Sequence, residues 1–205
     1  MNRKLLLIVG IPAVLLVLCI GIGVVASVAS SGNRNATKTA EAALNTQLIE
    51  PLKALCTGQS GGVSQAAAYT PGAGVHPVVA FRSLTAGTFF RDSRVGTGDW
   101  SPQTIGQAQL VACMEDTTVT VESCPYKSQT AGTTSTLDRL QNQVKVRLVS
   151  AKTGQVVGTQ TLKGGEPREC QDKETFASGA SKASVSGDAV TPSQIQSWLQ
   201  PFVKP

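Results

Sequence analysis

The chain has 205 residues, of which 41% are hydrophobic and 15% are charged, and its formal net charge is +5. The charged residues of both signs are spread along the chain without a block of like charge. A charge excess this small and diffuse argues against a nucleic-acid partner.

The first predicted element is a membrane-spanning helix. No charged residue lies between Lys4 and Arg34, and the segment Leu5 to Val28 is almost entirely apolar. As a helix this segment would rise roughly 36 Å, enough to cross a hydrocarbon core of about 30 Å. Cleavable signals have a shorter apolar region of about 7 to 15 residues, so an uncleaved signal anchor is favoured over a removed signal. We expect residues 1–33 to form a cytoplasmic tip and a transmembrane anchor, with the N-terminus inside the cell.

Residues 34–205 are expected to form one extracytoplasmic domain, which starts with a membrane-proximal helix over 34–56. Apolar side chains recur there at helical spacing. These are Leu44, Leu48, Leu52 and Leu55. Gly58 is a plausible stop for this helix, and the Gly-rich segment after it predicts a loop.

Three strand patterns follow along the chain. The apolar run from His76 to Phe81 predicts a buried strand with a proline near its start. Residues 108–116 and 118–124 are predicted to form a hairpin that turns at Asp116. Residues 143–150 alternate between apolar and charged side chains, and we expect a turn at 152–154 to pair them with 155–163 in a second hairpin.

The C-terminal segment carries the clearest helix signal. Thr191 and Gln194 form a capping box, and Pro192 occupies the first helical position. The helix is predicted to end at Pro201 and to present one apolar face, made of Ile195, Trp198, Leu199 and Phe202. Such a helix needs a sheet against which to bury that face. We therefore predict an α+β fold, in which an antiparallel sheet of about five strands is packed by an N-terminal and a C-terminal helix.

Four cysteines lie outside the predicted anchor. They are Cys56, Cys113, Cys124 and Cys170. An even number of cysteines in an exported chain favours two disulfides, and the three possible pairings are not separated by sequence. We expect Cys113 to pair with Cys124 across the first hairpin, which leaves Cys56 to pair with Cys170. A metal site is the less favoured alternative, because the chain has no C-x-x-C motif and its single histidine is distant in sequence.

His76 is the first candidate for chemistry, because a lone imidazole can act as a base, a ligand or a pH-sensitive group. The favoured interpretation is structural: the ring fixes the start of a strand by hydrogen bonding to the backbone. The segment Gly58 to Gly62 matches the G-x-S-x-G pattern of hydrolase nucleophiles around Ser60. It follows a predicted helix rather than a strand, and no acid lies between Ser60 and His76, so we interpret it as a loop. We predict no catalytic residues, no metal ligands and no cofactor.

Aromatic and basic side chains are the remaining candidates for binding. Trp100, Tyr69 and Tyr126 are candidate ligand contacts together with His76, although Trp100 is favoured as a core residue beneath a long loop. A basic sheet face towards anionic headgroups or wall polymers is a further alternative to an ordinary solvated face. Its members would be Arg139, Lys145, Arg147, Lys163 and Arg168.

The order of several short motifs resembles that of uncharacterised extracytoplasmic domains of bacterial membrane-anchored proteins. The motifs are Tyr69-x-Pro71-x-x-Gly74-x-His76-Pro77-Val78-Val79, Trp100-x-Pro102, Gln109-Leu110-Val111-Ala112-Cys113, Cys124-Pro125-Tyr126, Gly154, Pro167, Cys170 and Trp198-Leu199-x-Pro201. The resemblance runs from about Cys56 to Phe202. It implies a bacterial, exported domain with a paired cysteine hairpin, and it carries no activity.

These features predict a non-enzymatic binding or interaction module at the bacterial cell envelope. The membrane is one expected partner, through Leu5 to Val28, and an envelope protein or polymer is the other. The alternative is a small hydrolase or ligand sensor that uses His76.

Overall fold

The computed structural model describes residues 49–85, 87–128 and 132–205. Within these ranges no helix is long and apolar enough to cross a membrane. The predicted anchor at Leu5 to Val28 lies outside the described residues. The described residues all belong to one compact unit.

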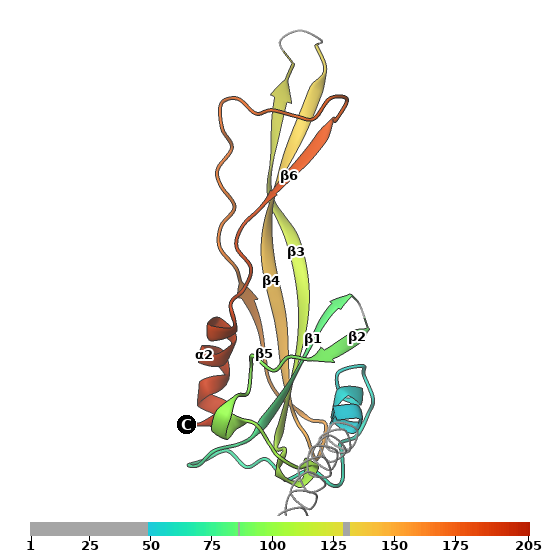
Figure 1. Ribbon diagram of the computed structural model, residues 1–205, viewed down its shortest axis with the longest axis vertical. Coiled ribbons are helices and arrows are strands. Elements are labelled where there is room, and N and C mark those ends of the chain that lie inside the picture. Colours follow the sequence, from blue (N-terminus) through green and yellow to red (C-terminus); the bar gives the residue numbers. More distant parts are fainter. Residues whose placement is uncertain (1–48, 86, 129–131) are drawn as a thin grey trace, which may run out of the picture. The chain divides into compact units, whose positions relative to one another are not determined.

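The fold is α+β, as predicted, and its sheet has six strands (Figure 1). The strands are β1 (Val78–Thr85), β2 (Thr88–Arg91), β3 (Leu110–Lys127), β4 (Thr134–Ser150), β5 (Val156–Lys163) and β6 (Lys182–Ser186). Their order is β2-β1-β3-β4-β5, and β6 pairs with the part of β4 that β5 leaves free.

The prediction of an antiparallel sheet was wrong, because the sheet is mixed. β1 pairs with β3 in parallel, and so does β4 with β6. After β1 the chain turns back into β2, and residues 92–109 then return it to the starting end of β1. Leu110 therefore lies beside Val78 and runs in the same direction.

Strand β3 replaces the first predicted hairpin. Residues 110–127 form one continuous strand, and the expected turn residue Asp116 lies in its interior, opposite Val144 of β4. The surrounding Thr and Val residues favour extended structure, and no glycine or Asn-Gly pair is present to reverse the chain. A single aspartate does not outweigh that preference.

The second predicted hairpin is confirmed. β4 and β5 are antiparallel, and Gly154 in the turn between them has φ +71°. A Cβ atom at Gly154 would lie 2.8 Å from the carbonyl oxygen of Gly61, so the loop at 58–62 packs closely against this turn.

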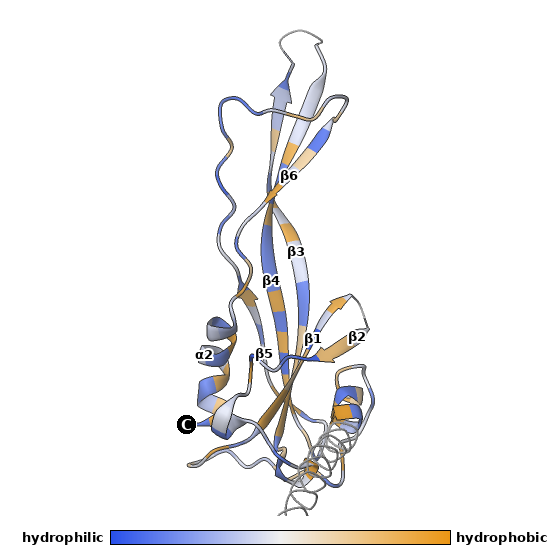
Figure 2. Cartoon of the chain, in the orientation of Figure 1, coloured by the Kyte–Doolittle hydropathy of each residue, from blue (hydrophilic) through white to orange (hydrophobic). Residues whose placement is uncertain are grey.

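Both faces of the central sheet are covered. One face, the 49–66 face, is covered by residues 49–66, whose helical part spans 49–54 in the described ranges. Its core includes Leu52, Leu55, Val79, Phe81, Val111 and Val149. The opposite face, the α2 face, is covered by the helix α2 (Pro192–Val203). Its core includes Val78, Leu110, Met114, Val146, Ile195 and Leu199. Neighbouring residues of β1 alternate between these two cores, and Figure 2 shows β1 as a mostly hydrophobic strand.

Helix α2 begins as predicted. The hydroxyl of Thr191 accepts a hydrogen bond from the backbone N–H of Gln194, whose side chain accepts from the backbone N–H of Thr191. The predicted end was slightly early, because the helix continues past Pro201 to Val203. Its buried residues face the sheet, so burial of this stripe stabilises the short helix.

All four expected cysteines form disulfides, but the expected pairing was wrong. Cys56 is bonded to Cys113, and Cys124 is bonded to Cys170. Because Cys113 and Cys124 lie on the same extended strand, they are roughly 37 Å apart and cannot be joined. The first disulfide links the helical segment to the sheet. The second links the loop after β5 to the far part of β3.

Candidate functional site

Strands β3 and β4 continue as a pair beyond the part of the sheet that the two cores cover. β1 accompanies β3 only as far as Glu115, where it pairs with Ser83. β3 and β4 continue together to Lys127 and Thr134. We call residues 116–127 of β3 and 134–142 of β4 the distal ribbon (Figure 1).

One face of the distal ribbon is covered by the loop that connects β5 to β6. Arg139 holds this loop by donating hydrogen bonds to the carbonyl oxygens of Pro167 and Arg168, each at 2.7 Å. The Gln141 amide donates to the Glu166 carboxylate at 2.9 Å. Figure 2 colours much of this loop hydrophilic, which agrees with attachment through polar contacts rather than through an apolar core.

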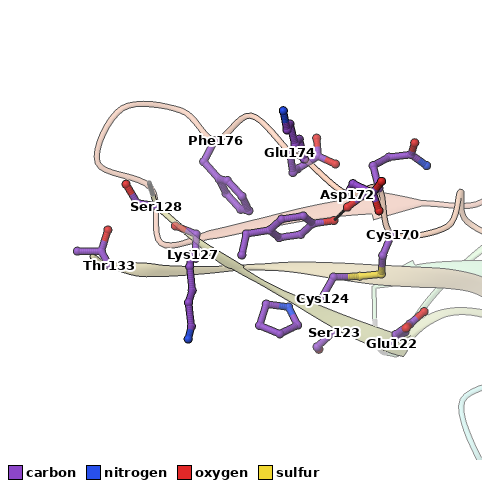
Figure 3. A pocket seen from close by; sticks show the side chains of 15 residues that line it. Glu122, Ser123, Cys124, Lys127, Ser128, Thr133, Cys170, Asp172, Glu174 and Phe176 are labelled. Atoms are coloured by element: carbon purple, nitrogen blue, oxygen red, sulfur yellow. Dashed lines mark hydrogen bonds between the residues drawn. A yellow bond between two sulfur atoms is a disulfide. The ribbon is translucent and has the colours of Figure 1, made fainter. Parts of the chain in front are cut away.

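A hollow of about 750 Å³ lies between this loop and the ribbon near its tip (Figure 3). The rings of Tyr126 and Phe176 meet edge to face, with centroids 5.7 Å apart. The Tyr126 hydroxyl donates to the Gln171 carbonyl oxygen at 2.9 Å. Lys127 and Glu174 also line the hollow. This mixture of aromatic and charged groups suits the binding of a polar or peptide-like ligand.

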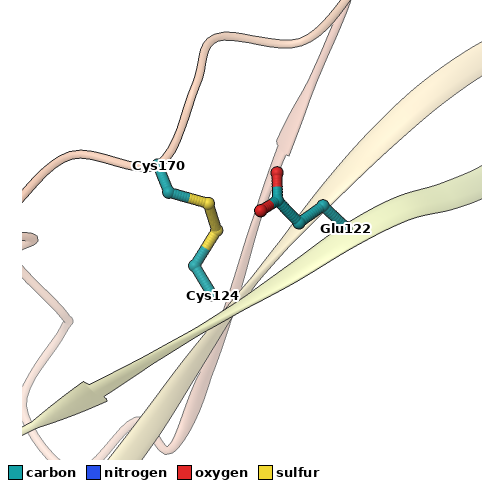
Figure 4. A group of neighbouring side chains, drawn as sticks. All are labelled: Glu122, Cys124 and Cys170. Carbon is teal, nitrogen blue, oxygen red and sulfur yellow. A yellow bond between two sulfur atoms is a disulfide. The ribbon is translucent and has the colours of Figure 1, made fainter.

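Beside the hollow, Glu122 lies close to the Cys124–Cys170 disulfide (Figure 4). The carboxylate and the two sulfur atoms lie within 4.8 Å of one another. The sulfur atoms are bonded to each other, however, and thiolates are the metal-binding form of cysteine. The Glu122 carboxylate pairs with Arg139. With the disulfide intact, these donors fit a structural cross-link and not a metal site.

The free side of β3 in the distal ribbon is an open strand edge. Among the described strands, none pairs with β3 on this side beyond Glu115. The six residues from Thr118 to Ser123 are all exposed, and they include Val119 at 38% and Val121 at 43%. A β-bulge interrupts the pairing with β4 between Thr120 and Glu122.

The hydrogen bonds of β4 show which backbone groups of this edge point outward. The carbonyl of Asn142 accepts from Gly164, and that of Leu140 accepts from Gly187, both on the side away from β3. The N–H and C=O of one residue in an antiparallel strand point the same way. The residues opposite Asn142 and Leu140, which are Thr118 and Thr120, therefore make no backbone hydrogen bonds to β4. The backbone groups of Thr118 and Thr120 therefore point away from the sheet.

The same reasoning applies above the bulge. The N–H of Thr136 donates to Ser181, away from β3. Pro125, which lies opposite Thr136, therefore points outward. Because proline has no N–H, this orientation removes no hydrogen bond between β3 and β4. Ser123 has the same orientation as Pro125, because strand residues two apart point the same way. The open edge thus offers the backbone groups of Thr118, Thr120 and Ser123.

The predicted ligand contacts do not form one site. His76 and Tyr69 lie together, with ring centroids 5.1 Å apart. Trp100 packs against the α2-face core. Tyr126 is separate from them and lines the hollow in the distal ribbon.

His76 is only 7% exposed, and both of its ring nitrogens are engaged. Nε2 lies 2.9 Å from the carbonyl oxygen of Gly72, and Nδ1 lies 2.9 Å from the side-chain oxygen of Gln109. Its backbone N–H donates to Val203 at the end of α2. Since a carbonyl oxygen only accepts, Nε2 donates its proton to Gly72, and Nδ1 then accepts from the side-chain amide of Gln109, whose nitrogen and oxygen can exchange places. This environment joins three chain segments, as expected for a residue that fixes the start of β1. Burial also raises the pKa of the neighbouring Tyr69 hydroxyl.

A buried ion cluster lies at the end of the α2-face core, and sequence reasoning did not identify it. The Asp92 carboxylate accepts two side-chain hydrogen bonds from Arg94, both 2.9 Å long, and lies 3.1 Å from Nε of Arg82. Arg82 also lies 3.5 Å from Asp116. Burial of Asp92 opposes its ionisation, but the hydrogen bonds and charge of Arg94, with the charge of Arg82, outweigh it and lower the pKa of Asp92. The one sequence signal was an arginine within an otherwise apolar strand.

Two of the basic residues considered for an anionic partner, Arg139 and Arg147, are engaged in structural contacts. Arg139 is committed to the loop carbonyls and to Glu122. Arg147 donates to the carbonyl oxygen of Leu55 at 3.0 Å, and so satisfies the end of the helical segment. Lys145 is exposed, as expected for a solvated sheet face.

Comparisons of this chain with family models, with curated proteins and with solved structures give no match.

Proposed function

We propose that this chain is a membrane-anchored, extracytoplasmic binding module of the bacterial cell envelope, and that the distal ribbon is its binding region. The observation that carries the proposal is the contrast between the covered central sheet and the ribbon, which combines the hollow near Tyr126 with the exposed edge from Thr118 to Ser123. An extended arm of this kind presents both side chains and backbone groups to a partner.

Two further features support the cellular location. The two disulfides favour an oxidising compartment outside the cytoplasm. The apolar segment Leu5 to Val28 is long enough to anchor the chain. The motif order that resembles bacterial extracytoplasmic domains agrees with both.

The two side chains that would be the best candidates for catalysis are engaged in structural contacts. His76 uses both ring nitrogens within the domain, and Asp92 is held by two arginines. A hydrolase or sensor built on His76 would require the imidazole to leave these contacts. We therefore favour binding over catalysis.

Site-specific photo-cross-linking of the full-length chain in intact cells tests the proposal. A cross-linking residue in place of Val121 should give a discrete adduct with an envelope component. The same residue in place of Val156, which is 56% exposed on β5, is the matched control and should give none. Equal labelling from both positions, or none from position 121, would contradict the assignment of the ribbon.

His76→Ala separates the two functional classes. We expect this variant to lose about 2 kcal/mol of stability, because two buried polar partners lose their hydrogen bonds. Adduct formation at position 121 should persist below the lowered melting temperature. Loss of function with unchanged thermal stability would instead favour the His76-based alternative.

A further inference from the structure

We propose that the open edge of β3 between Thr118 and Ser123 binds an extended segment of another protein by adding a strand to the sheet. This inference rests on the proposed function, since it names the kind of partner and the way in which the distal ribbon holds it.

The backbone of the edge has the geometry that strand addition needs. Thr118, Thr120 and Ser123 direct unpaired N–H and C=O groups to the open side, as the hydrogen bonds of β4 require. These groups match the hydrogen-bonding pattern of the backbone of an extended chain. Natural proteins usually cover such edges or keep them short, so a run of six exposed residues is a notable site.

The length of the added segment is limited at both ends. On one side β1 occupies the edge of β3 up to Glu115. On the other side Pro125 has no N–H to donate outward. The edge between them fits a segment of about five residues, and the bulge after Thr120 sets its register.

A second copy of this chain does not suit the edge. If two β3 strands paired antiparallel with Val119 opposite Val119, Asp116 of each copy would face Glu122 of the other, and like charges directly opposite are destabilising. The distal end of the second β3 would also run into the position that β1 occupies. The partner segment therefore comes from a different protein.

The side chains beside the edge define the chemistry of that segment. Val119 and Val121 favour β-branched residues opposite them. Glu115 is exposed at one end of the run, and the Glu122 side chain is 52% exposed at the other. Lysine or arginine at the ends of the segment would complement Glu115 and would share Glu122 with Arg139. We infer a short, β-branched segment with basic ends.

The outer edge of β5 provides an internal control. Thr161 lies opposite Lys145, which bonds to β3, so the backbone groups of Thr161 also point outward. This edge lacks the pair of exposed valines and the flanking acids of β3. At its end, the carbonyl of Lys163 already accepts a hydrogen bond from Gln194.

The test uses the full-length chain in detergent and a capped peptide, Lys-Val-Thr-Val-Lys. We expect saturable binding with a Kd at or below about 1 mM, and slower amide exchange at Thr118 and Thr120 when the peptide is bound. The same peptide N-methylated at every residue cannot donate strand hydrogen bonds on either of its edges, and it should bind at least about tenfold more weakly. This peptide control does not depend on the folding of any variant.

Two protein variants localise the binding. Thr118→Pro removes an outward N–H and spares the backbone bonds to β4, although the exposed hydroxyl bond from Thr118 to Asn142 is lost, and we expect about tenfold weaker peptide binding. Thr161→Pro makes the same change on β5 and should leave binding within about twofold. Failure of the peptide to protect the edge, equal binding of the N-methylated peptide, or dimerisation of the chain through β3 would each overturn the inference. In those cases the adduct from position 121 would still decide whether the ribbon is a binding region.

Discussion

The two parts of strand β3 share β4 as a neighbour on one side and differ on the other. From Leu110 to Glu115 the strand also pairs with β1, and apolar cores cover both faces of the sheet. Beyond Asp116 its second edge is open, and its cover is a loop held by polar contacts and one disulfide. The same strand therefore supports a stable core at one end and an accessible surface at the other.

This contrast predicts that mutations in the two parts have effects of different size. Phe81→Ala, in the covered part, should lower the free energy of unfolding by about 3–5 kcal/mol, because Phe81 is fully buried and its removal leaves a cavity. Val119→Ala, in the distal ribbon, should change it by less than about 0.5 kcal/mol. Urea unfolding of both variants measures the difference. Similar losses would show that the ribbon contributes to the main core.

The ion cluster at the boundary should be the next most sensitive point. Asp92→Asn leaves the partly buried Arg82 without its main counter-charge, and we expect a loss of about 3 kcal/mol at neutral pH. The pKa of Asp92 is lower in the folded state, so the ionised carboxylate stabilises the fold above its ordinary pKa. That contribution disappears as the pH falls through the lowered value.

The pH dependence of unfolding checks this sign. The stability difference between the parent chain and Asp92→Asn should shrink as the solution is acidified below the normal range of aspartate. A difference that stayed constant into strong acid would mean that the charge of Asp92 is not the cause. Glu174→Gln is a suitable control, because its partner Arg168 is exposed.

The second disulfide should have a smaller and more local effect. Replacing Cys124 and Cys170 by alanine should cost about 2 kcal/mol, and the loop that carries Pro167 and Phe176 should exchange its amides faster. The core around Phe81 should keep its protection. Uniform loss of protection across the sheet would contradict the separation of the ribbon from the core.

The elements that sequence predicted well are those determined by neighbouring residues. The start of α2 depends on Thr191, Pro192 and Gln194, and the β4–β5 hairpin depends on alternating side chains and a glycine turn. The buried strand after His76 was recognised from a short apolar run. In each case the decisive interactions lie within a few residues of one another.

The wrong predictions concern pairing between distant segments. Asp116 was predicted to be a turn residue because aspartate is common in turns. Its ion-pair partner Arg82 and the residue opposite it on β4, Val144, are distant in sequence and could not be recognised. Once β3 is continuous, Cys113 and Cys124 are too far apart to bond, so the error in the strand caused the error in the disulfides. The parallel pairing of β1 depends on the path of residues 92–109, which carries no simple pattern.

Only part of the candidate site could be predicted from the sequence. Tyr126 was singled out, but its partners Gln171 and Phe176 lie in the loop after β5, 45 or more residues further along the chain. The open edge had a usable signal: the run from Thr118 to Ser123 contains valines without a large apolar residue, which suits an exposed strand. Which side of that strand lacks a neighbour follows only from the sheet order.

Residue-resolved amide exchange along β3 in the full-length chain tests the open edge most directly. In the covered part, Val111 and Ala112 should both exchange slowly, because β4 and β1 accept their hydrogen bonds. In the distal ribbon, exchange should alternate: slow at Val119, which bonds to β4, and fast at Thr118 and Thr120, which point outward. Exchange at Thr118 and Thr120 as slow as at Ala112 in the unbound chain would contradict the account.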